Sequence, residues 1–297
     1  MKRVHWSGLI VLIVGVLLAT PLFAAADTYR AGPVSISLEF QWIRQGHVGI
    51  VRVSGVEIVE VRAVFQDRLY RFYPDPLGYV GLVSADMDKD IGIYVMQVWI
   101  TYADGSAERI DQEVEVNYGE FGRSEVTVSA SLLPLMEDDV ELSEADKLGN
   151  ITSRFTPERY WTDQGFIMPT DTEIIGWFGA WRLYNETYWR RHSGTDFKMG
   201  SGTPVIAAAS GRVMLVELLS IRGNYVLIDH GWSVFSGYAH MSQTFVVPGQ
   251  FVRQGDVIGM SGNTGRSSGA HLHLEISVGG VWVNPEDFIA LGVDKKE

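Results

Sequence analysis

The chain contains no cysteine among its 297 residues. Disulfide bonds and a lipid-modified N-terminal cysteine are therefore excluded, and stability has to come from buried apolar surface or a bound ion. Basic residues are also outnumbered: 24 lysines and arginines face 36 aspartates and glutamates, which gives a formal net charge of −12. An acidic chain is poorly suited to bind nucleic acid or an anionic membrane surface, so we expect neither as a partner.

A long apolar stretch occurs at the N-terminus. Two basic residues precede an apolar run from Leu9 to Leu18, and three alanines end at residue 26. This pattern predicts a signal peptide over residues 1–26, cleaved before Asp27. The protein is then exported to the periplasm, cell wall or medium, with no stable membrane insertion after cleavage. A retained anchor is the alternative, because Trp6–Phe23 is nearly long enough to span a bilayer.

A long helical period and an internal repeat are both missing. The chain has 32 glycines, and runs of Val, Ile, Tyr and Trp are frequent, so we predict an all-β protein. In residues 27–130 the segments SISLEF and VGIVRV alternate apolar and polar side chains, and Asp104-Gly105 joins two longer runs as a hairpin turn would. These features predict a β-sandwich-like accessory domain.

The character of the sequence changes over residues 131–164. The acidic stretch LMEDDVELSEADKLGN predicts a short helix with a solvated face, and Thr156 followed by Pro157 is typical of a second helix start. We therefore predict a partly helical connector here. Strand and turn signals return over residues 165–297, with dense glycines, and predict a second β domain.

Histidines are concentrated in this second domain. In the segment GAHLHLEI (Gly269–Ile276), residues two apart share one face of a strand. His271, His273 and Glu275 then lie on one side, while the apolar residues between them face the core. Taken alone, the histidine pair is equally compatible with ordinary polar surface.

A second sequence motif favours a chemical role for these histidines over a position on ordinary polar surface. His192 and Asp196 lie four residues apart in HSGTD, a probable turn that feeds a strand. Catalytic zinc sites use three protein ligands from histidine and carboxylate groups, so these two residues and one histidine of the H-x-H pair would form such a set. The helical H-E-x-x-H pattern is absent. His240, at the end of GYAH, would leave a further imidazole for proton transfer.

The region from about Phe166 to Phe288 resembles the LytM/lysostaphin-type zinc metallopeptidases, peptidase family M23. The resemblance rests on HSGTDF, GTPVIAAASGRV, GNYVLIDHG, GYAHMS, VRQGDVIGMSGNTG and HLHLEI, in this order. It implies an antiparallel β domain with a sheet-floored groove. It also implies an exported zinc metalloendopeptidase that hydrolyses peptide bonds in peptidoglycan cross-links, using a water activated by Zn²⁺ and two histidines.

The resemblance also implies a role for each site residue. His192, Asp196 and His273 correspond to the zinc ligands, and His240 and His271 to the catalytic pair.

Two tyrosines just upstream of His192 are candidates for a further role. Because the family often uses a tyrosine near the metal to hold the oxyanion, Tyr184 and Tyr188 could act there, although packing is the alternative role for each. The glycine-rich loop Gly259–Ala270 lacks a phosphate-binding Lys-Ser/Thr pattern and fits a groove wall better.

Other functions remain as alternatives. The main one is a catalytically silent M23-like regulator or binding module that activates other cell-wall hydrolases, but all three ligands and both catalytic candidates are present. A lipoyl-type carrier domain is excluded because no lysine lies between Lys198 and Lys295. The accessory domain could be a spacer, an inhibitory cap or a substrate-binding module, and the bond cut could lie in glycine-rich bridges or in direct D-alanyl cross-links.

Overall fold

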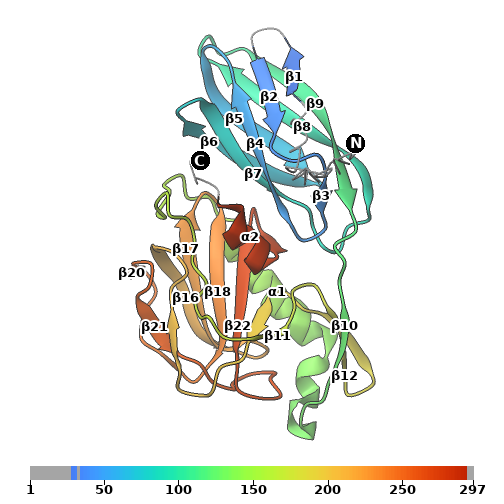
Figure 1. Ribbon diagram of the computed structural model, residues 1–297, viewed down its shortest axis with the longest axis vertical. Coiled ribbons are helices and arrows are strands. Elements are labelled where there is room, and N and C mark those ends of the chain that lie inside the picture. The colour runs from blue at the N-terminus through green and yellow to red at the C-terminus, as the bar shows by residue number, and fades with distance from the viewer. Residues whose placement is uncertain (1–27, 32–33, 293–297) are drawn as a thin grey trace, which may run out of the picture.

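The computed structural model describes residues 28–31 and 34–292, so the predicted signal peptide lies outside the described residues (Figure 1). Strands make up 49% of the chain and helices 11%, which confirms the all-β prediction. Within the described ranges, no helix is long and apolar enough to cross a membrane.

The N-terminal part forms one nine-stranded sheet that curls around an apolar core (Figure 1). Its strands are β1 (Thr28–Ala31), β2 (Val34–Leu38), β3 (Ile43–Arg44), β4 (Val48–Ser54), β5 (Ile58–Phe65), β6 (Arg68–Asp75), β7 (Gly78–Ser84), β8 (Gly92–Tyr102) and β9 (Ala107–Asn117). Neighbouring strands follow the order β1-β2-β4-β7-β6-β5-β8-β9-β3. The β8–β9 hairpin turns at Gly105, which has a φ of 84°, a conformation that glycine adopts at little cost.

The C-terminal part is built on an eight-stranded sheet with the path β11-β14-β22-β18-β17-β16-β20, and β23 pairs with β22. These strands are β11 (Ile174–Gly176), β14 (Thr195–Phe197), β16 (Gly211–Leu219), β17 (Gly223–Gly231), β18 (Val234–Met241), β20 (Phe251–Val252), β22 (Leu272–Val278) and β23 (Val281–Val283). The short helix α2 (Pro285–Leu291) follows.

Two small sheets border this main sheet. One contains β15 (Pro204–Ile206), β21 (Val257–Met260) and β19 (Gln243–Thr244), and the other contains β10 (Arg123–Val126), β12 (Trp181–Tyr184) and β13 (Tyr188–Arg191). Strand β10 comes from the segment that descends from the upper domain along the side of the lower one (Figure 1). It pairs in parallel with β12 and so ties the connector to the C-terminal part.

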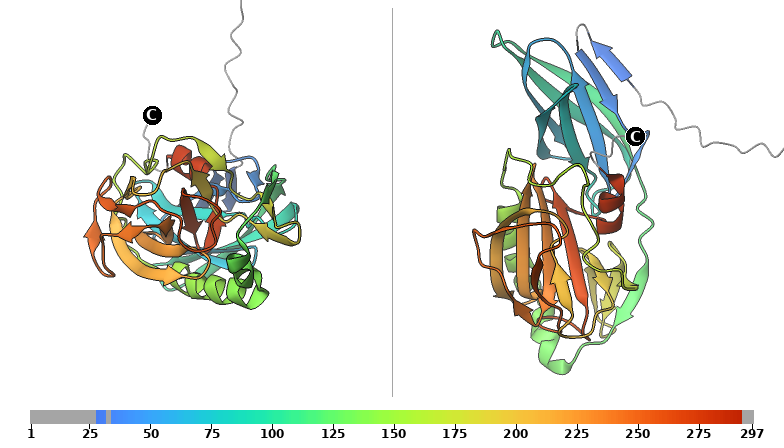
Figure 2. Two further views of the ribbon diagram at one scale, coloured as in Figure 1. Left: turned by 90° about the horizontal axis from the view of Figure 1, so that it is seen from below. Right: turned by 60° about the vertical axis from the view of Figure 1, so that its left-hand side comes forward.

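The connector contains the 3-10 helix η1 (Ala130–Met136) and helix α1 (Asp138–Thr152). Helix α1 packs on one face of the main sheet, where Leu148 joins Leu219, Tyr225 and Leu227 in a buried cluster (Figure 2). The second predicted helix start, at Thr156, is wrong. Residues around Thr156 instead form backbone and side-chain hydrogen bonds with the β17–β18 turn, which hold the segment extended.

The acidic face of α1 is only partly solvated: Asp138 is exposed, as the sequence suggested, whereas Glu144 is buried. Three of its carboxylates contact arginines of the C-terminal part. The pairs are Asp138 with Arg190, Glu141 with Arg190 and Arg266, and Glu144 with Arg222. These carboxylates recur every three residues and therefore point to one side of the helix. The connector is thus part of the C-terminal fold.

Candidate metal centre and groove

Three predicted ligands meet at one point. The His192 Nε2 atom lies 3.0 Å from Asp196 Oδ1 and 3.0 Å from His273 Nδ1, and the last two atoms are 2.8 Å apart. All three residues are buried, with exposed fractions of 4–6%. These three side chains each offer one ligand atom to a common point, and this His-Asp-His group could hold a metal ion.

Local structure explains the convergence. Asp196 on β14 lies directly opposite His273 on β22 in the antiparallel ladder. His192 reaches the same point because the Ser193-Gly194 turn approaches β22 closely. A Cβ atom at Gly194 would lie 2.1 Å from the Leu274 carbonyl oxygen and 2.9 Å from the His273 ring, so only glycine fits there.

The remaining polar atom of each ligand is also held. The three contacts are His192 Nδ1–H to the Trp177 carbonyl (2.7 Å), Arg182 Nη2–H to Asp196 Oδ2 (2.6 Å), and His273 Nε2 to Glu275 Oε1 (3.3 Å). Each outer contact leaves the inner nitrogen or oxygen free to bind a metal, as second-layer partners do in metal sites. Lone pairs from two imidazoles and one carboxylate therefore converge on a common point.

Electrostatics keep two of these groups in the metal-binding form at neutral pH. Burial lowers the pKa of His192 to about 4, despite the nearby Asp196 carboxylate. Burial alone would raise the pKa of Asp196, but the surrounding imidazoles, His192 above all, hold it well below its usual range. His192 is thus a neutral base and Asp196 an anion.

His240 reaches this site through a β-bulge. Asn224 pairs with Met241 and Val226 pairs with Tyr238, so β18 contains one residue more than β17 over this stretch. His240 has a φ of 59°, a left-handed conformation that is rare for a residue with a side chain. The extra residue turns its side chain to the face on which His273 lies, instead of the opposite face that strict alternation would give.

His240 and His271 form a pair beside the three ligands. Their ring centroids lie 4.7 Å apart, and the His240 ring lies 5.8 Å from that of His273. The His240 Nδ1–H donates to the Thr264 carbonyl (2.8 Å) and the His271 Nδ1–H donates to the Gly269 carbonyl (2.8 Å). In each ring these bonds leave Nε2 as the atom available for proton transfer.

The two rings differ in their surroundings. Burial, and then the neighbouring His271 and His273, lower the pKa of His240 well below its usual value, so that it is neutral at pH 7. The His271 Nε2 atom lies 3.5 Å from Asp196 Oδ1, close to the three ligands.

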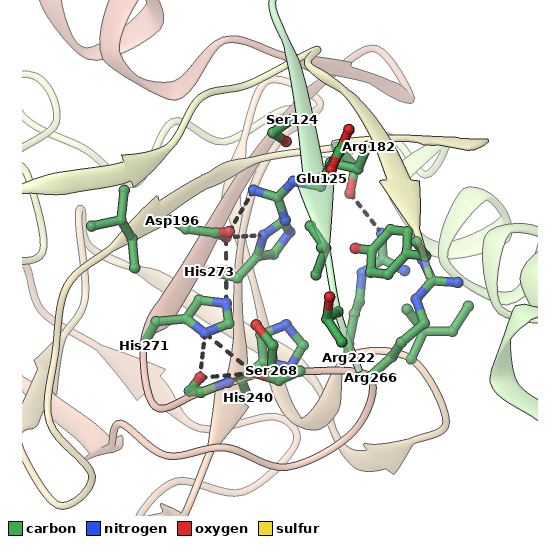
Figure 3. Close-up of a pocket in the computed structure, with 18 of the residues that line it drawn as sticks. Ser124, Glu125, Arg182, Asp196, Arg222, His240, Arg266, Ser268, His271 and His273 are labelled. Atoms are coloured by element: carbon green, nitrogen blue, oxygen red, sulfur yellow. Dashed lines mark hydrogen bonds and ion pairs between the residues drawn. The ribbon is translucent and has the colours of Figure 1, made fainter. Parts of the chain in front are cut away.

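The group opens into a groove of about 370 Å³ (Figure 3). Figure 3 shows Asp196, His271, His273 and His240 together, with the side chains of Arg222 and Arg266 nearby. One wall is β10 with Ser124 to Thr127, and another is the loop from Arg266 to Ala270, which agrees with the groove-wall interpretation of that glycine-rich loop.

The two predicted tyrosines occupy different places. Tyr184 lines the groove, where its ring lies 5.0 Å from the Arg266 guanidinium carbon. Tyr188 is not among the described residues that line it, and packs with Val128 and Met136. The structure therefore favours Tyr184 over Tyr188 as a residue that could contact a ligand.

Several residues of the site were not predicted from the sequence. They are Arg182, Arg222 and Arg266 in the groove lining, and Glu144 and Glu275 beneath it. Glu275 had a visible signal, because it shares the strand face with both histidines. The arginines had none: Arg222 and Arg266 meet carboxylates 53 and 125 positions away, and no local pattern links Arg182 to Asp196.

A family model confirms the resemblance. It describes peptidase family M23 and matches residues 190–285, a range that contains His192, Asp196, His240, His271 and His273. Residues 190–285 therefore carry the sequence pattern of peptidase family M23.

Characterised relatives match the same M23 region. The chain is 45% identical over 109 residues to the peptidoglycan DD-endopeptidase ShyA of Vibrio cholerae, which covers 36% of this chain and 25% of ShyA. It is 29% identical over 207 residues to ShyB of the same organism, covering 67% of this chain and 47% of ShyB. The matches thus span between a quarter and a half of these relatives.

The M23 fold is also seen in a solved structure. A candidate M23 peptidase from Pseudomonas aeruginosa superposes with a TM-score of 0.61 and 24% identity, covering 84% of this chain and 95% of that one. At this identity the likeness concerns the fold, and it extends over both the accessory and the C-terminal parts.

Proposed function

We propose that this chain is an exported zinc metalloendopeptidase that hydrolyses peptide bonds in the cross-links of bacterial peptidoglycan. The observation that carries the proposal is the convergence of the His192, Asp196 and His273 ligand atoms at one end of a groove, beside two further imidazoles. The relatives named peptidoglycan DD-endopeptidases support cleavage in direct cross-links between D-amino acids. The N-terminal sequence pattern supports export.

The donor set suits zinc. Ligand atoms bound tetrahedrally at about 2.0–2.1 Å from one zinc ion lie roughly 3.3 Å apart, close to the 2.8–3.0 Å separations found among His192, Asp196 and His273. When bound, zinc supplies Lewis-acid activation of water and of the scissile carbonyl. The chain's own part is to present two imidazole nitrogens and one carboxylate oxygen in fixed directions.

Proton transfer falls to the two remaining histidines. His240 is neutral and has a free Nε2, so it can accept a proton from the attacking water. His271 has its Nε2 directed toward the ligand group, and in its protonated form it can stabilise the developing oxyanion or protonate the departing amine. Tyr184, on the groove wall, can contact the same oxyanion.

The division of the chain is part of the proposal. Residues 27–130 form the accessory domain and residues 165–297 contain the peptidase machinery, while the connector at 131–164 contributes helix α1, which packs on one face of the main sheet. The accessory domain packs against the peptidase part, with Ile50, Val80 and Leu82 in the same apolar cluster as the main sheet.

The test is direct cleavage. Residues 27–297, loaded with zinc, are incubated with purified peptidoglycan that contains direct D-alanyl cross-links and with peptidoglycan that contains glycine bridges, and the fragments are identified by mass spectrometry. We expect new termini in the direct cross-links, absent with the His271→Ala variant. If neither wall is cut, the proposal fails in favour of a silent regulator of other hydrolases.

A further inference from the structure

A buried group of charged residues lies directly behind the metal ligands and takes no part in the proposed chemistry. Its members are Glu275 on β22, Arg222 before β17, and Glu144 on helix α1. Glu275 is fully buried, Glu144 is 6% exposed, and the Arg222 side chain is 11% exposed. Buried charges are costly unless each is fully paired, so such a group is expected to serve a purpose.

Glu275 contacts the ligand His273 and is itself held on several sides. Its Oε1 lies 3.3 Å from His273 Nε2. Its other contacts all come from donors: Tyr225 Oη–H to Oε2 (2.8 Å), Arg222 Nε–H to Oε2 (2.8 Å), and Ser193 Oγ–H and Arg222 Nη2–H to Oε1. Because these donors fix its position, the carboxylate reaches His273 at the outer nitrogen, Nε2.

This contact decides which nitrogen of His273 faces the metal. A neutral imidazole carries one N–H, and the Glu275 carboxylate favours that proton on Nε2. The lone pair is then on Nδ1, which is the atom that meets His192 and Asp196. Glu275 thus sets both the tautomer and the ring direction that metal binding needs.

Arg222 is positioned in turn by the connector helix. Its Nη1–H donates to Glu144 Oε1 (2.8 Å), and the same glutamate accepts from the backbone N–H groups of Ile221 (2.9 Å) and Arg222 (3.2 Å). Without Glu144, Arg222 would lose one of its two carboxylate partners and two backbone N–H groups would lose their acceptor. The contacts therefore run without interruption from α1 to His273.

We propose that Glu275 is a positioning residue for the metal ligand His273, and that Glu144 of helix α1 supports it through Arg222. The connector helix is then a working part of the metal centre, although none of its residues binds the metal. This inference rests on the metal site of the proposed function, but not on which bond is cut.

The experiment measures zinc affinity rather than turnover. Zinc dissociation constants of residues 27–297 are determined by competition with a chromophoric chelator, and the cobalt-substituted proteins are compared by their visible absorption. We expect Glu275→Gln to bind zinc about 10–100-fold more weakly and to change the cobalt spectrum, because a neutral amide neither fixes the tautomer nor matches the charge of Arg222. Glu144→Gln should weaken zinc binding in the same direction but less.

The matched control is Glu217→Gln. Glu217 forms an exposed ion pair with Lys147, which also joins helix α1 to the main sheet but lies outside the Glu144–Arg222–Glu275 contacts. Its zinc affinity and cobalt spectrum should equal those of the wild type. Wild-type affinity in both Glu275→Gln and Glu144→Gln, with the fold intact by circular dichroism, would overturn the inference.

Two further outcomes are decisive. If Glu275→Gln does not fold, Tyr225→Phe removes only the hydroxyl that bonds Glu275, and must still weaken zinc binding several-fold; unchanged affinity there refutes the inference. If the wild type binds zinc but cuts no peptidoglycan, the proposed function fails while the positioning role stands. A wild type that binds no zinc would refute both.

Discussion

At the scale of single residues, the site depends on where each imidazole directs its free nitrogen. His240 and His271 donate from Nδ1 to backbone carbonyls, whereas His273 turns Nδ1 inward and contacts Glu275 through Nε2. Three histidines of one groove thus use opposite nitrogens for different tasks. This difference separates a metal ligand from a residue that transfers protons.

The first prediction separates these tasks by substitution. His273→Ala should lose bound zinc, because it removes one of three ligands. His271→Ala should keep one zinc per chain but lose turnover by roughly 10²–10⁴-fold, the range typical of general acid–base groups. Metal content measured by mass spectrometry and cleavage of a soluble cross-linked muropeptide test the two variants side by side. A His271→Ala protein with normal turnover would contradict the assignment.

The second prediction concerns His230, a fully buried histidine outside the metal site, bonded to the Ser210 carbonyl and the Ser236 hydroxyl. Burial lowers its pKa from 6.5 to about 4. Between these values the unfolded chain binds a proton that the folded chain does not, so the folded state loses stability as the pH falls from about 6.5 to about 4. The total is roughly 3 kcal/mol for this one group.

The measurement is the free energy of unfolding in urea at pH 7 and pH 5, for the wild type and for His230→Asn. The asparagine keeps hydrogen-bonding groups but cannot titrate. The variant costs some stability at both pH values. Its loss between pH 7 and pH 5 should nevertheless be smaller than that of the wild type. An equal loss in both proteins would show that His230 does not contribute.

Much of the site could be predicted because β22 is regular. Alternation along GAHLHLEI places Leu272 and Leu274 in the apolar core and His271 and His273 on the other face, as the structure shows. The rest depends on features without a local pattern. The bulge at His240 arises from one extra residue in β18, and Arg222 meets Glu144 across 78 positions of the chain. Neither spacing nor composition encodes such contacts.

At the scale of elements, helix α1 differs most from expectation. Its acidic residues were expected in solvent, because closely spaced carboxylates usually are, but they meet arginines from three separate segments of the chain. The apolar face of the helix is small. Its main contact is Leu148, which is 1% exposed and packs on the main sheet. Charge pairing and a few apolar contacts together hold the helix beneath the metal centre.

The third prediction tests this packing. Leu148→Ala should lower the free energy of unfolding by about 2–5 kcal/mol, because it leaves a cavity against Leu219 and Tyr225. The control is Leu142→Ala on the same helix, whose side chain is 63% exposed and whose loss should change stability by no more than about 0.5 kcal/mol. Chemical denaturation of both variants gives the comparison, and equal effects would contradict the packing described.

At the scale of the whole molecule, the accessory and peptidase parts share apolar contacts rather than a flexible tether. Ile50, Val80 and Leu82 belong to the cluster that includes the main sheet. The Tyr73 ring stacks on Trp232 at 4.5 Å between centroids and an interplanar angle of 12°. Trp232 has a φ of 53°, an uncommon conformation for a bulky residue that the stack helps to maintain.

The fourth prediction follows from this stack. Wild-type residues 27–297 should unfold in one thermal transition, because Ile50, Val80 and Leu82 of the accessory part are buried in the same apolar cluster as the main sheet. Tyr73→Ala should lower the midpoint by several degrees, at about 2–4 °C per kcal/mol for a chain of this size, and separate the unfolding of the two parts. The control is Leu77→Ala. Leu77 lies on the same hairpin and is 77% exposed, so its loss should leave the midpoint and the shape of the thermal transition unchanged. Two separate transitions in the wild type would contradict the prediction.

The shared interface has a mechanical consequence. Because the two parts share buried apolar contacts, any surface that the accessory domain touches sets the height and tilt of the groove above it. Bonds at one fixed distance from that surface would then come within reach of the metal centre, whereas chemically identical bonds nearer or farther away would not. If the chain cuts cross-links as proposed, its selectivity among them depends on their position in the wall as much as on their sequence.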